Sequence, residues 1–93
     1  MWVVYESSEL DKISSKLPPE ILKRYEKWKD IVRITGLRGL REIKGFHDEK
    51  LSGAWQGYRS SRLGDKYRVI YQADTDRFVV KVVRITPHDY RRK

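Results

Sequence analysis

Two arginines, Arg59 and Arg68, are the residues of this sequence whose type and placement most suggest chemistry. They fall in residues 56–63 and 67–73, two runs whose period of two predicts β-strands. A guanidinium is permanently charged and can hold two oxygens of one anionic group. The pair therefore predicts a site that binds an anion. The same spacing also fits ordinary arginines on the solvent side of a half-exposed sheet, and both interpretations stay open here.

The turn between the two runs predicts which side chains meet. Gly64-Asp65 is a two-residue hairpin signal with glycine first, which would pair Ser61 with Arg68 and Arg59 with Ile70. Side chains alternate between the faces of a sheet, so Arg59, Ser61 and Arg68 are expected on one face. Helices in so short a chain can cover only one face, and we expect the face with these arginines to be open and cationic.

Two further polar groups could supply acid–base chemistry. His47, Asp48, Glu49 and Lys50 form one cluster in a predicted loop, and His88 with Tyr90 follows the last predicted strand. Histidine titrates near neutral pH, which suits proton transfer. As an alternative to a catalytic role, His47 also fits an ordinary surface histidine, and the Pro-His-x-Tyr sequence also fits a cap at the edge of the sheet.

The sequence lacks the residues and motifs of several other kinds of active site. The chain has no cysteine, two histidines without zinc-site spacing, no glycine-rich phosphate loop and no serine in a strand–turn–helix elbow. We therefore expect neither metal nor cofactor. No apolar run approaches the roughly 20 residues of a membrane span, and the N-terminus is unlike a signal peptide. A cytoplasmic protein without a membrane partner is expected.

The elements that must position these residues follow from periodicity. A strand is expected at residues 2–5, helices at 8–17 and from Pro19 to about Gly36, a connecting loop at 37–50, and strands at 56–63, 67–73 and 78–85. Ile21, Tyr25, Trp28 and Val32 form the apolar stripe of the second helix. The order β-α-α-β-β-β predicts one α+β domain over residues 1–93, with two helices packed on an antiparallel, twisted sheet.

The charge of the chain indicates its class of partner. Among 93 residues, 21 are Lys or Arg and 13 are Asp or Glu, a net charge of +8. Residues 59–93 hold 10 basic and 4 acidic side chains, so most of the excess lies in the C-terminal third. This distribution favours a polyanionic partner such as nucleic acid or the ribosome.

Several motifs resemble a known family. They are Leu51-Ser52-Gly53-Ala54-Trp55-Gln56-Gly57-Tyr58-Arg59, Arg62-Leu63, Tyr67-Arg68-Val69-Ile70-Tyr71 and His88-Asp89-Tyr90. Together they resemble the RelE/ParE superfamily of toxins from type II toxin–antitoxin systems, most closely its YafQ, YoeB and HigB-type members. The resemblance is dense over residues 43–90 and looser over 1–42. It implies a RelE-like fold related to microbial ribonucleases.

The resemblance also implies roles for individual residues. Arg68 falls at the family's catalytic arginine, and Arg59 and Ser61 fall at two strand positions that are lysines in RelE. His88 falls near a C-terminal Arg or His, and Tyr90 near a terminal aromatic. His47, Glu49 and Lys50 lie where related toxins carry a His or Glu, and the match does not decide which of them is the base. The cations expected to hold RNA are Lys50, Arg62, Lys66, Arg84, Arg91 and Arg92.

The implied activity is metal-free cleavage of mRNA in the ribosomal A site. A base takes the 2′-OH proton, an acid such as His88 protonates the leaving 5′-oxygen, and the arginines stabilise the phosphorane. The implied partners are a cognate antitoxin, ribosomal RNA and mRNA, with the toxin alone a monomer. The alternatives are a ParE-like inhibitor of DNA gyrase, which shares the fold, and a small nucleic-acid-binding module without activity.

Overall fold

The computed structural model describes residues 1–87, apart from the side chains of Ile13 and Ser14. The chain begins with β1 (Val3–Glu6), α1 (Glu9–Ser14) and α2 (Pro19–Thr35). A short α3 (Leu37–Glu42), the 3-10 turns η1 (Lys44–Phe46) and η2 (Gly53–Trp55), and the two-residue strand β2 (Glu49–Lys50) follow. The domain ends with β3 (Arg59–Arg62), β4 (Arg68–Asp74) and β5 (Val79–Thr86).

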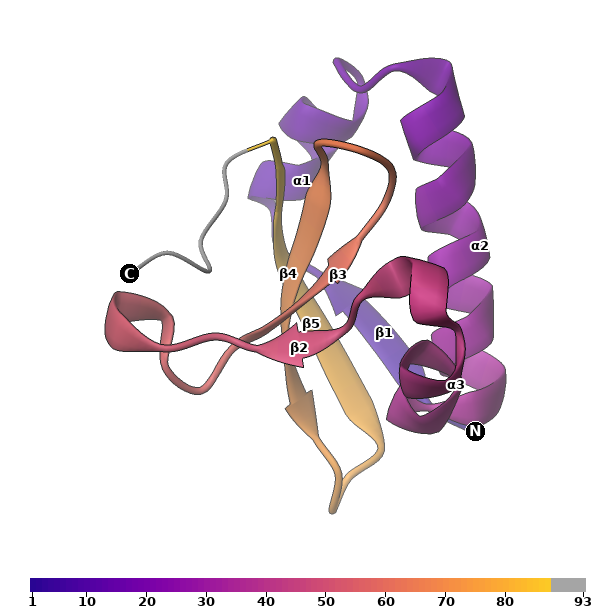
Figure 1. Ribbon diagram of the computed structural model, residues 1–93, viewed down its shortest axis with the longest axis vertical. Coiled ribbons are helices and arrows are strands. Elements are labelled where there is room, and N and C mark those ends of the chain that lie inside the picture. The colour runs from indigo at the N-terminus through magenta and orange to yellow at the C-terminus, as the bar shows by residue number, and fades with distance from the viewer. Residues whose placement is uncertain (88–93) are drawn as a thin grey trace.

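The five strands form one mixed sheet in the order β1-β5-β4-β3-β2, and α2 runs along one side of it (Figure 1). The predicted α+β class is confirmed, but the fully antiparallel sheet is wrong because β1 pairs with β5 in parallel. The whole chain between β1 and β5 forms the long connection that parallel pairing requires. The predicted loop at residues 37–50 also contains α3 and β2, since Leu37 and Leu40 are buried against the core.

The core lies between α2 and the sheet. Tyr25, Trp28 and Val32 are at most 1% exposed, as the apolar stripe predicts, and the Trp28 ring packs edge-on against Tyr71 of β4 at 5.3 Å. The second helix ends beside Gly36, as predicted, in a backbone conformation with φ of 67°. A Cβ there would lie 2.4 Å from the Trp2 indole nitrogen, so only glycine fits.

The register of the β3–β4 hairpin differs from the prediction by one residue. Arg62 pairs with Arg68 and Ser60 with Ile70, and the Leu63 amide donates to the Tyr67 carbonyl at 2.8 Å. Three residues therefore form the turn instead of two.

Burial of Leu63 explains the longer turn. The extra residue places Leu63, which is 1% exposed, on the same face as Val69 and Tyr71. The two-residue turn would put that side chain on the opposite face, at a cost of about 2 kcal/mol in lost burial.

No helix in the described part of the chain is both long and apolar enough to cross a membrane.

Candidate functional site

The observed register separates the two arginines that were expected to share a face. Arg68 points to the outer face, which we define as the face of the sheet turned away from α2. Arg59 lies on the inner face with Ser61, Val69 and Tyr71. The prediction of one face carrying both cations is therefore wrong, and the reason is the additional residue in the turn.

Arg68 is the centre of a small polar cluster on the outer face. Its Nη1 donates to the Ser60 hydroxyl at 2.9 Å and lies 3.6 Å from Oε2 of Glu49. Arg62 lies opposite Arg68 across the two strands. Like charges in facing positions destabilise a sheet, and the Glu49 carboxylate offsets part of that cost. We call Glu49, Ser60, Arg62 and Arg68 the outer-face cluster; its excess of positive charge suits an anion.

A hollow of about 300 Å³ lies on the β5 side of the outer face. The Trp55 and Tyr58 rings pack edge-on at 5.0 Å, and the Arg84 guanidinium lies 5.5 Å from the centre of the Trp55 ring. Arg84 also approaches Glu9 at 4.0 Å. An aromatic pair beside a cation can receive a stacked base and its phosphate. Trp55 and Tyr58 were missed as site residues, although their W-x-x-Y spacing lies within the recognised motif.

Arg59 belongs to a partly buried network on the inner face. Asp48, whose side chain is 0% exposed, accepts from Arg59 Nη2 at 2.6 Å and Nε at 3.1 Å. It also accepts from the Ser61 hydroxyl at 2.7 Å and from the Tyr71 hydroxyl.

The hydrogen bonds and charges of this network raise the pKa values of two of its members. Burial alone would lower the pKa of Arg59, but the hydrogen bonds and charge of Asp48 outweigh it, and the pKa is raised. Burial, reinforced by Asp48, also raises the pKa of Tyr71. Arg59 is therefore charged and forms an intramolecular ion pair with Asp48.

The remaining predicted site residues are dispersed. His47 is exposed in a left-handed conformation with φ of 44°, Lys50 pairs with Arg59 at the sheet edge, and Lys66 is exposed in the hairpin turn. Only Glu49 of the three candidate bases is in contact with Arg68.

The tail residues named as site candidates lie outside the described residues; they are His88, Tyr90, Arg91 and Arg92. Across residues 1–87, no group of three potential metal ligands comes together.

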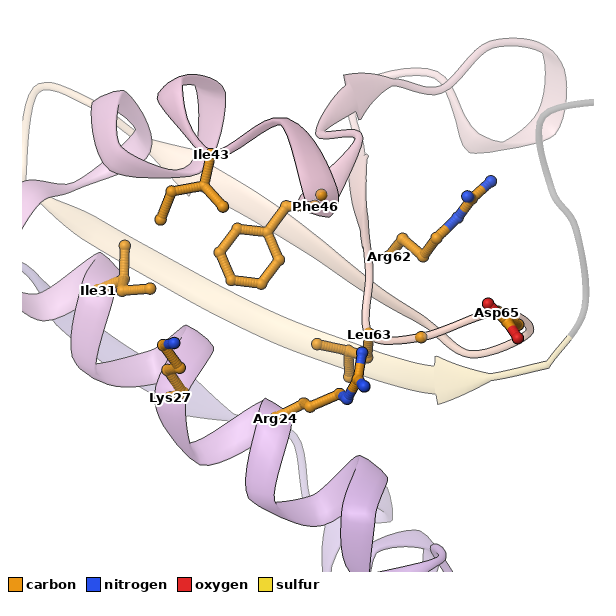
Figure 2. Close-up of a pocket in the computed structure, with 10 residues that line it drawn as sticks. Arg24, Lys27, Ile31, Ile43, Phe46, Arg62, Leu63 and Asp65 are labelled. Atoms are coloured by element: carbon orange, nitrogen blue, oxygen red, sulfur yellow. The ribbon is translucent and has the colours of Figure 1, made fainter.

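A separate groove of about 460 Å³ runs between α2, η1 and the β3–β4 turn. Figure 2 shows Ile31 of α2 facing Ile43 and Phe46 across it, with Lys27 on the same side as Ile31. Its lining residues also include Arg24, Arg62, Leu63 and Asp65. We call this the α2 groove; it combines an apolar floor with three cations and one acid.

Comparison with known proteins gives relatives only at the level of structure. No protein-family model matches the sequence, and no curated protein matches it. The archaeal RelE–RelB complex from Pyrococcus horikoshii contains a chain of 27% identity and TM-score 0.74, with 92% of this chain and 93% of that chain covered.

Two bacterial structures are similar at lower identity. A YafQ variant from E. coli superposes with TM-score 0.71 at 16% identity, covering 91% of each chain. The YoeB–YefM complex from Staphylococcus aureus gives 0.70 at 18%, covering 96% of this chain and 99% of that one. These neighbours are toxins of toxin–antitoxin systems. The resemblance predicted from the sequence is thus confirmed, and the chain has the fold of the RelE/YafQ/YoeB-type toxin family.

Proposed function

We propose that this protein is the toxin of a type II toxin–antitoxin system and acts as a ribosome-dependent endoribonuclease on mRNA. The observation that carries the proposal is the outer-face cluster, where a carboxylate and a guanidinium meet on the face turned away from α2. Similarity to RelE, YafQ and YoeB structures supports the toxin role. Such a protein would act in the cytoplasm, where the ribosomes are.

In this proposal Glu49 is the general base. Its carboxylate takes the 2′-OH proton of the nucleotide before the scissile bond, and the 2′-oxygen attacks phosphorus. Arg68 stabilises the charge that develops on the phosphorane oxygens, and Ser60 orients its guanidinium. Arg68 is 4% exposed, so only a small part of its guanidinium is open to a phosphate in this structure. His88 would protonate the leaving 5′-oxygen, giving a 2′,3′-cyclic phosphate and a 5′-OH.

The aromatic hollow supplies a second part of the proposed RNA site. Trp55 offers a ring face on which an unstacked base could lie, and Arg84 lies beside it for the adjoining phosphate. Base–aromatic stacking contributes roughly 1–3 kcal/mol per base without reading sequence. Placement of the mRNA in the ribosome would then decide where cleavage occurs.

The proposed partner that neutralises the toxin is an acidic antitoxin encoded beside it. Solved complexes of similar toxins include RelB and YefM. The α2 groove suits an acidic segment with apolar side chains, because Ile43 is 42% exposed at its rim and Arg24, Lys27 and Arg62 line it. We place the antitoxin contact there, away from the outer-face cluster.

Primer extension on a defined mRNA tests the proposed activity. Purified protein should produce new 5′ ends within codons in the presence of translating ribosomes and none on naked mRNA. Arg68→Ala should lose at least 100-fold in cleavage rate while remaining folded, because removal of one group that stabilises the transition state costs about that much. Arg77→Ala, which removes an exposed arginine, is the matched control.

Uncut mRNA together with gyrase-dependent DNA damage would show that the protein is a ParE-like inhibitor and not a nuclease. Full cleavage by a folded Arg68→Ala variant would contradict the proposed chemistry.

A further inference from the structure

Asp48 and Glu49 are consecutive residues whose carboxylates serve opposite faces of the sheet. Asp48 is enclosed on the inner face by Arg59, Ser61 and Tyr71. Glu49, the first residue of β2, reaches Arg68 on the outer face. Alternation along an extended chain means that fixing one of the two side chains also fixes the direction of the other.

The backbone around Glu49 has little support of its own. β2 has two residues, and within residues 1–87 it forms the edge of the sheet and pairs with β3 alone, through Glu49–Ser60 and Lys50–Arg59. The segment before it is a single 3-10 turn, and His47 adopts a left-handed conformation. A two-residue edge strand is a weak determinant of position, because so few ladder hydrogen bonds hold it.

The Asp48 carboxylate supplies the missing anchor. It joins this segment to two side chains of β3 and to the Tyr71 hydroxyl of β4, and the Tyr71 ring is itself packed against Trp28 in the core. The position of the segment is thereby tied to the buried core. A fully enclosed carboxylate with this many donors resists displacement, because every hydrogen bond that it loses leaves a polar group unsatisfied.

We propose that Asp48 is a positioning residue, which acts through the backbone to hold the Glu49 carboxylate against Arg68 on the far side of the sheet. The inference rests on the proposed function, in which Glu49 is the base. Asp48 itself touches no substrate. Its effect on cleavage is geometric, because displacement of a reacting group by about 1 Å can cost on the order of 100-fold in rate.

The test uses the double variant Ser61→Ala/Tyr71→Phe, which removes two hydrogen bonds to Asp48 and leaves the Arg59–Asp48 ion pair, so that the fold survives. The crystal structure of the double variant, without RNA, should show the distance from Arg68 Nη1 to Glu49 Oε2 lengthened from 3.6 Å by about 1 Å or more. In ribosome-dependent cleavage, kcat should fall at least 10-fold with KM within 2-fold of the wild-type value. In a Glu49→Gln background the same double variant should cause no further fall.

Tyr25→Phe is the matched control, since it also removes a partly buried hydroxyl–carboxylate hydrogen bond, 2.6 Å long and made to Glu6 of β1, at the other edge of the sheet from Glu49. It should change neither the Arg68–Glu49 distance nor kcat. An unchanged Arg68–Glu49 distance in the double variant overturns the proposal, as does an equal loss of kcat with and without Glu49. If the wild-type protein cleaves no RNA, the proposed function fails, and the distance still decides whether Asp48 positions Glu49.

Discussion

The guanidinium of Arg68 and the carboxylate of Glu49 lie 3.6 Å apart, joined across β3 by the pairing of Glu49 with Ser60. A permanent cation and a potential proton acceptor are therefore held by β4 and β2, the two strands on either side of β3. Their charges stabilise each other before substrate arrives. Binding of a phosphate between them would place a 2′-OH near the base and the phosphorane oxygens near the cation, which is the arrangement that RNA cleavage by 2′-OH attack requires.

Glu49→Gln should reduce the rate of mRNA cleavage by about 100-fold or more, because the amide cannot accept the 2′-OH proton. Single-turnover cleavage of a defined mRNA by the two proteins provides the test. A variant with an unchanged rate would assign the base to another group.

Arg59→Met should act mainly on stability. The substitution leaves the Asp48 carboxylate, 0% exposed, without its counter-charge, at a cost of about 3 kcal/mol in the free energy of unfolding. Urea denaturation measures the loss. The double variant Asp48→Asn/Arg59→Met should recover part of it. If Arg68→Met lowers the free energy of unfolding as much as Arg59→Met does, Arg59 has no special structural role, and the prediction is wrong.

Glu6 should make stability depend on pH in the acidic range. Burial would raise its pKa, but hydrogen bonds from Tyr25 and Lys29 and the Lys29 charge outweigh burial and lower it from 4.5. A lowered pKa in the folded state stabilises the fold above the unfolded pKa and loses that contribution as the pH falls through the folded value.

Glu6→Gln should therefore be less stable than wild type at pH 7, by at most about 1 kcal/mol because the side chain is 40% exposed. The difference should shrink as the pH drops below about 4.5, the ordinary value. Thermal unfolding of both proteins between pH 7 and 3 measures it. A difference that grows toward low pH would contradict the assigned direction.

Ile43→Asp should weaken neutralisation by the antitoxin without reducing toxicity. The new carboxylate meets both the apolar floor of the α2 groove and the acidic segment proposed to bind there, so affinity should fall at least 10-fold. Calorimetric titration with the protein encoded by the adjacent reading frame gives the Kd. Lys23→Glu, an exposed position on α2 that does not line the groove, is the control. Equal losses in both variants would mean general charge repulsion.

The parts of the structure that the sequence predicted correctly depend on short-range periodicity. Tyr25, Trp28 and Val32 recur at helical spacing, so their burial on one face of α2 follows from the geometry of a single helix. Gly36 ends that helix as expected. The two strands of the hairpin were likewise visible in local patterns.

The register of the hairpin was decided by packing between distant segments. Gly64-Asp65 alone favours a two-residue turn, but burial of Leu63 with Val69 and Tyr71 against α2 outweighs that local preference. One additional residue in the turn moved Arg59 into the ion pair with Asp48 and left Arg68 on the outer face.

The contact between Glu49 and Arg68 required the same tertiary information, because β2 is too short to have a recognisable pattern. The sequence by itself determined which residues could perform chemistry and which elements carry them. Only the three-dimensional packing decided which of them meet, since the face on which a strand side chain lies reverses with a shift of one residue and is set by what the core buries.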